Sequence, residues 1–348
     1  MTGQTNAGGA DREGLVIVGN DGGTNVGASL LRAARRCGLA AVLVDARRAF
    51  AAPRIVGRVN WWLRGRRPTR LAAFGREVAE ACRTHRPRWL LTTGLAPVDR
   101  GALDAVTAVG VETINYLTDD PWNPAFRSEW FLEALGGYRR VATVRRSNIG
   151  DLKAATRADI EYVPFGFDQE IFYPRPADWP LDPGSPAGVF FAGGADRDRV
   201  PYIQALMAAG IEIALYGDHW DRHPETRAAA RGYLEPDALR EHIWNAAVCL
   251  CLVRRANRDG HSMRTFEVPA AGGCMCVEDT DEHRDIFGED GVAVRYFTGP
   301  DDEVAITKEL LACPERRQAL AAASHRRVWD SACTYDHRLR QILRLATP

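Results

Sequence analysis

Long apolar runs are missing from this sequence of 348 residues, and its mean hydropathy is -0.27. No stretch approaches the roughly 18 residues that a membrane-spanning helix requires. Residues 1–14 are polar and rich in glycine and alanine, and they lack the apolar stretch of a signal peptide. We therefore expect a cytoplasmic protein without a transmembrane segment, in which residues 1–14 form a disordered tail.

A surplus of charge is also missing, because 45 basic side chains balance 45 acidic ones. Nucleic-acid binders need a basic surplus to displace counterions, so we expect no nucleic-acid partner. The balance conceals an asymmetry, since residues 1–165 carry 24 basic and 16 acidic side chains, and the remaining residues carry 21 and 29. Two halves of opposite sign could attract one another, although solvated faces are the simpler interpretation.

The eight cysteines follow neither a disulfide pattern nor a metal-binding pattern. The pairs Cys249/Cys251 and Cys274/Cys276 are each separated by one residue, whereas a zinc knuckle uses C-x2-C. Alternation places each pair on one face of a strand. We expect buried free thiols and assign no metal-binding residue.

Apolar, strand-like runs alternate with helical segments along most of the chain. The clearest runs are 15–19, 40–45, 89–93, 112–117, 189–192, 211–216, 247–253 and 274–278. Residues 163–176, which are rich in proline, glycine and aromatic side chains, interrupt the alternation and indicate a linker. Continuous apolar strands separated by helices indicate parallel sheets covered on both faces. The sequence therefore predicts an α/β fold with two Rossmann-like, doubly wound domains facing a cleft.

The first candidate site is the glycine-rich loop after the first predicted strand, with Asp21, Gly22, Gly23 and Asn25. Free amides at a helix N-terminus hold anions, so this loop is a candidate acceptor or phosphate site. The spacing is not G-x-G-x-x-G, and a tight turn is the alternative interpretation.

The second candidate is the pair Asp119 and Asp120, which directly follows an apolar strand. Adjacent carboxylates repel one another, so one of them could keep a raised pKa and act as a general base. A helix-capping aspartate before Pro121 explains the same spacing equally well.

The third candidate is the segment 258–273, which follows the predicted strand at 247–253. Ser262 could cap a short helix starting at Met263, whose open amides would hold a diphosphate. Arg264 offers a charged fork to phosphate oxygens, and Glu267 could accept hydrogen bonds from ribose hydroxyls. An ordinary amphipathic helix with Arg264 and Glu267 paired at i,i+3 is the alternative.

Two further loops follow predicted strands of the second half, and they contain Gly193, Gly194, Gly217 and Asp218. Small residues there would let the phosphates or the sugar of a donor approach the backbone, and plain strand–helix turns are the alternative. An arginine-rich stretch at 47–70 includes Trp61 and Trp62. It could bind an acidic acceptor or a membrane surface, but a solvated helix with one apolar face is the favoured interpretation.

Together these motifs resemble the CgeB-like, spore-maturation-type glycosyltransferases, relatives of the nucleotide-sugar-dependent families with the GT-B fold. The resemblance is carried by NYLTDDPWNP at 115–124, VPFGFD at 163–168, FFAGG at 190–194, IEIALYGDHW at 211–220, RTFEVPAAGG at 264–273, PERRQAL at 314–320 and TYDHRLRQIL at 334–343. Related retaining families carry two glutamates eight positions apart. The second falls on Glu267 here, and the shorter Asp259 stands at the first.

The resemblance implies an acceptor domain at 15–165, a linker at 166–185, a nucleotide-sugar donor domain at 186–330 and a C-terminal helix at 331–348 that packs back on the first domain. It places Asp259, Gly260 and His261 near the donor sugar. It also implies a metal-independent enzyme of EC 2.4 type without a cofactor.

The predicted activity is transfer of a sugar from a nucleoside-diphosphate sugar, with UDP, dTDP or GDP, to a small-molecule or glycan acceptor. A homodimer is left open. The alternatives are a nucleotide-sugar epimerase or hydrolase of the same fold, or a non-catalytic sugar-nucleotide-binding partner protein.

Overall fold

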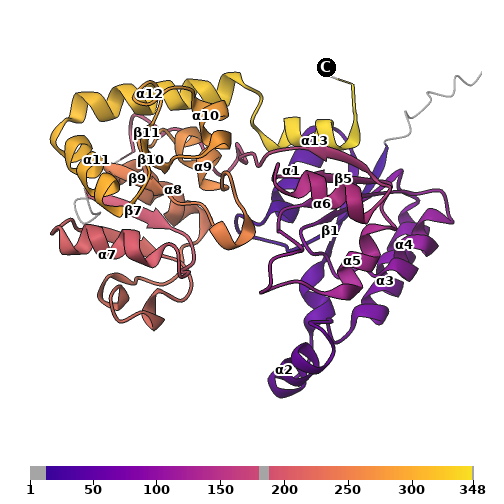
Figure 1. Cartoon of the computed structure of the whole chain (residues 1–348). Coiled ribbons are helices and arrows are strands. Elements are labelled where there is room, and N and C mark those ends of the chain that lie inside the picture. Colours follow the sequence, from indigo (N-terminus) through magenta and orange to yellow (C-terminus); the bar gives the residue numbers. More distant parts are fainter. Residues whose placement is uncertain (1–12, 180–187, 347–348) are drawn as a thin grey trace, which may run out of the picture. The chain divides into compact units, whose positions relative to one another are not determined.

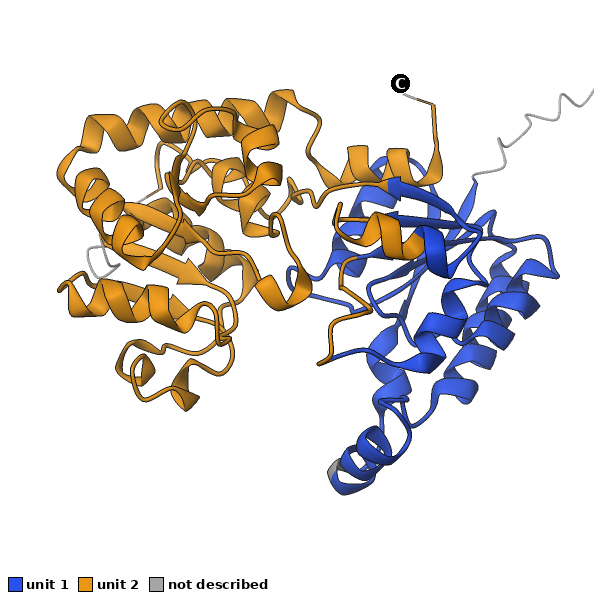
Figure 2. Ribbon diagram, viewed as in Figure 1, with its two compact units in different colours: residues 1–117, 126–142, 153–161 blue, residues 118–125, 143–152, 162–348 orange. Residues whose placement is uncertain are grey.

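The computed structural model describes residues 13–179 and 188–346. The chain divides into two compact units (Figure 2), of which unit 1 comprises Met1–Leu117, Phe126–Ala142 and Lys153–Glu161. Unit 2 comprises Thr118–Ala125, Thr143–Leu152 and Tyr162–Pro348. Two short segments of the first half therefore belong to unit 2.

The domain boundaries predicted from the sequence remain a prediction. Most of the predicted tail, residues 180–185 of the predicted linker and the last two residues lie outside the described part of the chain.

Unit 1 is built on a six-stranded sheet with the strand order β2-β1-β3-β4-β5-β6 (Figure 1). The pairs β1/β2, β1/β3 and β3/β4 are parallel. The strands are β1 (Gly14–Gly19), β2 (Ala40–Asp45), β3 (Trp89–Thr93), β4 (Glu112–Leu117), β5 (Arg140–Thr143) and β6 (Asp159–Tyr162). The helices are α1 (Val26–Arg36), η1 (Ala46–Phe50), α2 (Arg54–Leu63), α3 (Leu71–His85), α4 (Arg100–Thr107) and α5 (Glu129–Leu135), together with the end of α6 (Asn148–Ala155), whose first residues belong to unit 2.

Unit 2 contains a five-stranded sheet with the order β11-β10-β9-β7-β8, in which every pair is parallel. The strands are β7 (Val189–Ala192), β8 (Ile213–Tyr216), β9 (Val248–Cys251), β10 (Met275–Glu278) and β11 (Arg295–Phe297). The helices are α7 (Val200–Ala208), η2 (Trp220–Arg222), η3 (Arg227–Ala229), α8 (Pro236–Asn245), η4 (Arg255–Asn257), α9 (Arg264–Ala270), α10 (Asp281–Phe287), α11 (Pro300–Ala312), α12 (Pro314–Asp330) and α13 (Tyr335–Leu343).

Apolar strands form the centre of each unit because every second side chain points to each face and both faces are covered. All four residues of β7, β9 and β10 are buried. The predicted α/β architecture with two parallel sheets is therefore confirmed. Among the described residues, no helix is both long and apolar enough to cross a bilayer.

The four cysteines of the C-x-C pairs are buried free thiols, as predicted. β9 and β10 are neighbours, and Met275 lies opposite Cys249 in their register. Burial raises the pKa of the Cys274 thiol to about 12. These thiols therefore stay protonated and act as small apolar side chains.

A buried carboxylate on α11 is the least satisfied polar group of unit 2. Glu303 is inaccessible to solvent, and neither carboxyl oxygen has a hydrogen-bond partner among the described residues. Burial raises its pKa to about 8. Between the ordinary pKa of 4.5 and this value, the folded state keeps a proton that the unfolded state has lost. Folding stability should therefore fall as the pH rises through that window.

We expect Glu303→Gln to be more stable than the parent chain by about 1–3 kcal/mol above pH 8, because the amide mimics the protonated acid without the buried charge. The difference should shrink toward pH 5, where the parent side chain is already neutral. Urea unfolding at the two pH values measures both effects. Glu309→Gln, on the exposed face of the same helix, is the matched control. A parent chain whose stability is constant across this window would contradict the prediction.

Candidate functional site

Two glycine loops meet at the carboxyl ends of β7 and β8. The Gly193 N–H donates to the Tyr216 carbonyl at 2.9 Å, and the Ala195 N–H donates to the Asp218 carbonyl at 2.8 Å. Gly217 has a φ of +123°, and a Cβ atom there would lie 2.2 Å from the Gly193 carbonyl oxygen. Only glycine fits at this position, so the predicted donor-binding residues Gly193, Gly194, Gly217 and Asp218 do lie together.

Three arginines surround the first of these loops. The buried Arg199 donates to the Gly194 carbonyl at 3.1 Å and to the Leu252 carbonyl at 2.9 Å. The Arg264 Nε donates to the Ala192 carbonyl at 3.2 Å. Arg254 lies near both Gly194 and Asp196, with 3.6 Å between its Nε and an Asp196 carboxyl oxygen. Three guanidinium groups therefore converge on residues 192–196.

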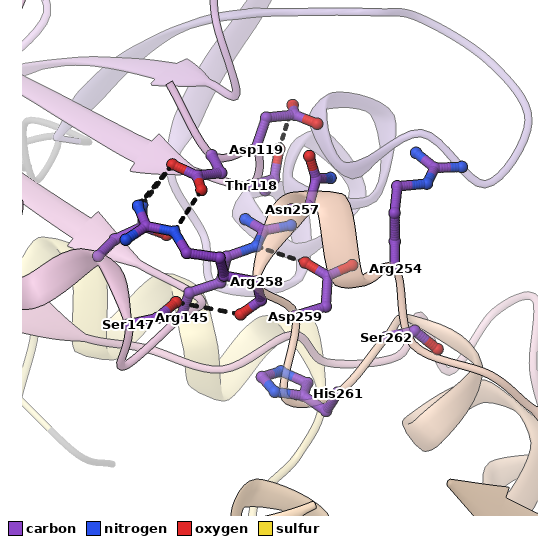
Figure 3. Close-up of polar contacts among 12 residues, drawn as sticks. Thr118, Asp119, Arg145, Ser147, Arg254, Asn257, Arg258, Asp259, His261 and Ser262 are labelled. Atoms are coloured by element: carbon purple, nitrogen blue, oxygen red, sulfur yellow. Dashed lines mark hydrogen bonds and ion pairs between the residues drawn. The ribbon is translucent and has the colours of Figure 1, made fainter. Parts of the chain in front are cut away.

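The positive charge of these three arginines exceeds the negative charge of the carboxylates that form ion pairs with them. Asp196 and Glu267 are the two carboxylates that pair with them, against three guanidinium groups. The Arg254 side chain is 35% exposed, and Figure 3 shows it extended away from the Arg258–Asp259 segment. Burial lowers the pKa of Arg264 to about 10, so it stays charged at neutral pH. We name Arg199, Arg254 and Arg264 the cationic cluster.

The helix after this cluster differs partly from the prediction. α9 begins at Arg264 and no side chain caps it, so the predicted capping role of Ser262 is wrong. The Ser262 N–H instead donates to the Thr265 hydroxyl at 3.0 Å. The helix has only 7 residues and contains Pro269, which agrees with the short element predicted. Arg264 and Glu267 form the i,i+3 ion pair that was the alternative interpretation.

Arg258 organises the loop between β9 and α9. Its backbone is left-handed, with a φ of +53°, and its side chain contacts two carboxylates. The Nε atom lies 2.6 Å from the Asp120 carboxylate, and an Nη atom lies 2.7 Å from Asp151. Asp120 also accepts from the Asn148 amide at 2.8 Å. Both acidic partners come from the segments of the first half that belong to unit 2.

These contacts bear on both interpretations of Asp120, as a general base and as a helix-capping residue. Burial acts to raise its pKa, but the hydrogen bonds from Arg258, the Trp122 backbone and Asn148 outweigh burial and hold the pKa below the usual value. This shift is opposite to the one expected of a general base. The helix-capping alternative is wrong, because the next helix along the chain begins at Glu129 and not at Pro121.

Asp119 has a different environment from its neighbour. It is half-buried and accepts a 3.4 Å hydrogen bond from the Thr118 hydroxyl (Figure 3). It is therefore the more accessible of the two carboxylates. The catalytic assignment of Asp119 and Asp120 remains a prediction.

Asp259, which stands at the first acidic position of the resemblance, forms a buried ion pair with Arg145. Burial raises the pKa of Asp259, and the Arg145 guanidinium opposes this rise. Gly260 follows, and a Cβ atom there would lie 2.5 Å from the carboxyl carbon of Glu282. Because Gly260 has no side chain, the Glu282 carboxylate fits beside it and accepts a hydrogen bond from His261.

His261 has internal partners on both ring nitrogens. Nε2 accepts the Phe165 N–H at 3.1 Å, so Nδ1 carries the proton and donates to Glu282 at 2.5 Å. Burial lowers the pKa of His261, which keeps the ring neutral. Glu282 also accepts from the Tyr162 hydroxyl at 3.0 Å. These bonds make His261 a positioning residue for the loop, while its contact with a donor sugar remains a prediction.

The predicted loop of unit 1 does form a tight turn at the start of α1. Gly22 and Gly23 have φ values of +74° and +57°, and the Asn25 amide donates to the Gly22 carbonyl at 2.8 Å. The Asp21 carboxylate accepts from the Gly22 N–H at 2.8 Å. This geometry matches the turn that was the alternative interpretation. Its binding role remains a prediction.

Sequence reasoning missed Arg199 and Arg254 as candidate functional residues. Arg254 follows the apolar run 247–253, and carboxyl ends of parallel strands are where ligands bind. The position of Arg254 directly after this run could therefore have identified it as a candidate from the sequence alone. No group of three or more histidine, cysteine, aspartate or glutamate side chains in the described ranges is arranged to hold a metal ion.

We expect Arg258→Ala to destabilise the chain by about 2–3 kcal/mol, because it leaves the Asp120 carboxylate buried without its main partner. Adding Asp120→Asn should recover part of this loss, since the buried charge is then gone. Urea unfolding of the two single variants and the double variant measures the coupling. Arg284→Ala, which breaks the more exposed pair with Asp279, is the control. A double variant as unstable as the sum of the single variants would contradict this account.

The comparisons with known proteins agree with this architecture. Residues 199–344 match the model of a family described as glycosyl transferase-like. The matched residues lie in the second half of the chain. No curated protein sequence matches the chain.

Several solved structures are similar to this chain over most of its length. Sucrose-phosphate synthase from Thermosynechococcus elongatus has a TM-score of 0.69 at 12% identity, covering 96% of this chain and 98% of that one. HepE from Anabaena in complex with UDP-glucose has a TM-score of 0.62 at 12% identity, covering 95% and 98%. A putative UDP-N-acetylglucosamine 2-epimerase from Listeria monocytogenes has a TM-score of 0.56 at 12% identity, covering 95% of each chain. The predicted GT-B fold class is confirmed.

Proposed function

We propose that this protein is a glycosyltransferase that moves a sugar from a nucleoside diphosphate to a small-molecule or glycan acceptor. The observation that carries the proposal is the cationic cluster, which lies at the carboxyl ends of parallel strands within unit 2. All three of its arginines lie in the region 199–344 that matches the glycosyl transferase-like family. The finer resemblance to CgeB-like enzymes is part of this proposal.

The cationic cluster suits a diphosphate. Guanidinium groups donate two parallel hydrogen bonds to phosphate oxygens, and the glycines at 193 and 194 let the phosphates approach the backbone. Arg254 is the member with the most exposed side chain and is the main contact. Three guanidinium groups supply the charge that stabilises a departing diphosphate, so the proposed reaction is metal-independent.

The remaining donor contacts follow from the neighbours of this cluster. Glu267 orients Arg264 through their ion pair, and we assign its other oxygen to the ribose hydroxyls. Asp259 faces the donor sugar, and Arg145 keeps its carboxylate oriented. Asp119 is the general base for the acceptor hydroxyl, because Asp120 is committed to Arg258. The loop at 21–25 is assigned to the acceptor side.

We expect Arg254→Ala to weaken binding of the preferred nucleoside diphosphate by about 10–100-fold, the value of one or two charged hydrogen bonds. Isothermal titration calorimetry with UDP, dTDP and GDP identifies the preferred nucleotide and then compares the variants. Arg284→Ala removes a guanidinium group on α10, away from the cationic cluster, and is the matched control. Unchanged affinity in both Arg254→Ala and Arg264→Ala would overturn the diphosphate site.

The main alternative is a nucleotide-sugar epimerase or hydrolase, and the likeness to the putative epimerase from Listeria monocytogenes favours it among the other functions. A non-catalytic sugar-nucleotide-binding protein is a further alternative. An epimerase or hydrolase consumes the donor rapidly without an acceptor, whereas a transferase hydrolyses it slowly. A binding protein leaves the donor intact under every condition.

We expect Asp119→Asn to lower turnover by about 100-fold while leaving donor affinity unchanged, because a general base contributes 10²–10⁴-fold to the chemical step. Chromatography of the products from donor alone, and from donor with a panel of sugar acceptors, measures turnover. Asp104→Asn, at an exposed position on α4, is the control. Rapid conversion of the donor alone, unaffected by Asp119→Asn, would contradict both the transferase and this base.

A further inference from the structure

Helix α2 carries an apolar face that no described residue of unit 1 covers. Figure 1 shows α2 standing apart from the other helices of unit 1. The chain on either side of α2 is fixed, since the Arg70 N–H donates to the Ala49 carbonyl at 3.0 Å. After the helix, the Trp130 indole donates to the Arg66 carbonyl at 3.3 Å. Hydrogen bonds within unit 1 therefore hold both chain segments that flank α2.

The exposed face is a continuous stripe and not a set of scattered side chains. Its members are Ile55 (79% exposed), Val56 (50%), Val59 (50%), Trp62 (76%) and Leu63 (79%). At 100° per residue, these five positions fall within an arc of about 120°. The positions on the other side of the helix, Gly57, Asn60 and Trp61, are half-buried. The large apolar side chains therefore face solvent, while the less exposed side faces the unit.

Such a stripe is unusual on a protein surface. Single exposed apolar side chains are common, but contiguous apolar surface on one element marks an interaction site. All five members are β-branched, large aliphatic or aromatic residues whose exposure costs free energy in water. Phe50, in η1, adds a further exposed ring, at 47%. The stripe is therefore a docking surface.

The charged residues around the stripe indicate what kind of partner binds it. Residues 46–70 contain eight arginines and no acidic residue, and the arginines are Arg47, Arg48, Arg54, Arg58, Arg64, Arg66, Arg67 and Arg70. Three of them, Arg47, Arg48 and Arg67, form ion pairs with acidic residues outside this stretch. Arg58 and Arg64 are exposed, and neither forms an ion pair within the described ranges. Arg58 lies at the edge of the apolar arc, where its guanidinium group can reach past the stripe. The surface therefore combines exposed apolar side chains with the positive charges of Arg58 and Arg64.

We propose that α2 docks the protein onto a membrane surface rich in anionic lipids, lying in the plane of the interface. The stripe enters the boundary between head groups and acyl chains, Arg58 and Arg64 contact lipid phosphates, and Trp62 takes the interfacial position that tryptophan prefers. A helix of 10 residues is about 15 Å long, half of the hydrocarbon thickness, so this is peripheral attachment and not insertion across the bilayer.

A second copy of the chain fits the stripe less well. Pairing two stripes about a two-fold axis would bring the Arg58 side chains and their neighbours against one another, and like charges repel. An anionic bilayer satisfies both properties of the surface at once. This inference concerns unit 1 alone and does not depend on the proposed glycosyltransferase activity.

Flotation of the full chain with lipid vesicles tests the proposal. We expect binding to phosphatidylcholine vesicles that contain phosphatidylglycerol, and at least about tenfold weaker binding to pure phosphatidylcholine, because each arginine gains free energy only near an anionic surface. Trp62→Ser with Leu63→Ser should lower the partition coefficient by about tenfold or more. Arg58→Glu with Arg64→Glu should abolish the preference for the anionic lipid.

The matched control is Tyr233→Ser with Val292→Ser, which removes two equally exposed apolar side chains from unit 2 and should leave vesicle binding unchanged. Nucleotide affinity, measured by calorimetry on the Trp62/Leu63 variant, shows that the variant is folded and separates this test from the proposed function. Absence of binding to anionic vesicles would overturn the proposal. So would a dimer in sedimentation velocity that the Trp62/Leu63 variant dissolves, because a second copy would then cover the stripe.

Discussion

The ion pairs around Arg258 fix the segment on which the candidate site depends. The loop from β9 to α9 has little regular structure of its own, and one of its residues, Arg258, adopts a left-handed backbone. That conformation costs free energy for a residue with a Cβ atom, so the loop needs partners that hold it. Asp120 and Asp151 supply them on one side, and Arg145 holds Asp259 on the other. The position of Asp259 and the entry into α9 follow from these contacts.

These pairs also explain why the charge balance of the two halves was a poor guide. The first half is basic and the second is acidic, which suggests basic residues of the first half pairing with acids of the second. Arg145 with Asp259 follows that direction, but Arg258 with Asp120 and Asp151 runs against it. Pairing in a folded protein is decided by local geometry over a few ångströms, and a net charge summed over 165 residues carries no such information.

The parallel sheets could be predicted because β7 and β9 are apolar at every position and β10 is apolar up to Glu278, and such runs are typical of strands buried on both faces. The meeting of the Gly193 and Gly217 loops followed from that topology. The partners of His261 could not be predicted, since they come from Phe165 and Glu282, both distant in sequence. The capping role of Ser262 failed because α9 begins at Arg264, so that Met263 and not Ser262 stands at the N-cap position, a shift of one residue that spacing does not resolve.

Helix α2 illustrates the same limit. Apolar residues at i, i+4, i+7 and i+8 are typical of a helix that packs on a core and equally of one that lies on a membrane. The sequence favoured a solvated helix with one apolar face, and the helix is present. Only the three-dimensional structure shows that the stripe itself is exposed, because the short polar and small residues on the opposite side, Gly57 and Asn60, are the ones nearer the unit.

The cationic cluster shows how a protein can keep like charges together. Arg199 is surrounded by carbonyl groups at the ends of β7 and β9, whose partial negative charges offset part of its own. The offset is incomplete, because burial still lowers the pKa of both Arg199 and Arg264. A lowered pKa means that the charged forms are less stable here than in water, so an approaching anion gains more from them than it would from exposed arginines. In the proposed function, the free energy that the fold loses by gathering these side chains is recovered when a diphosphate binds, and Arg254, the most exposed of the three, is the side chain that we expect this ligand to meet first.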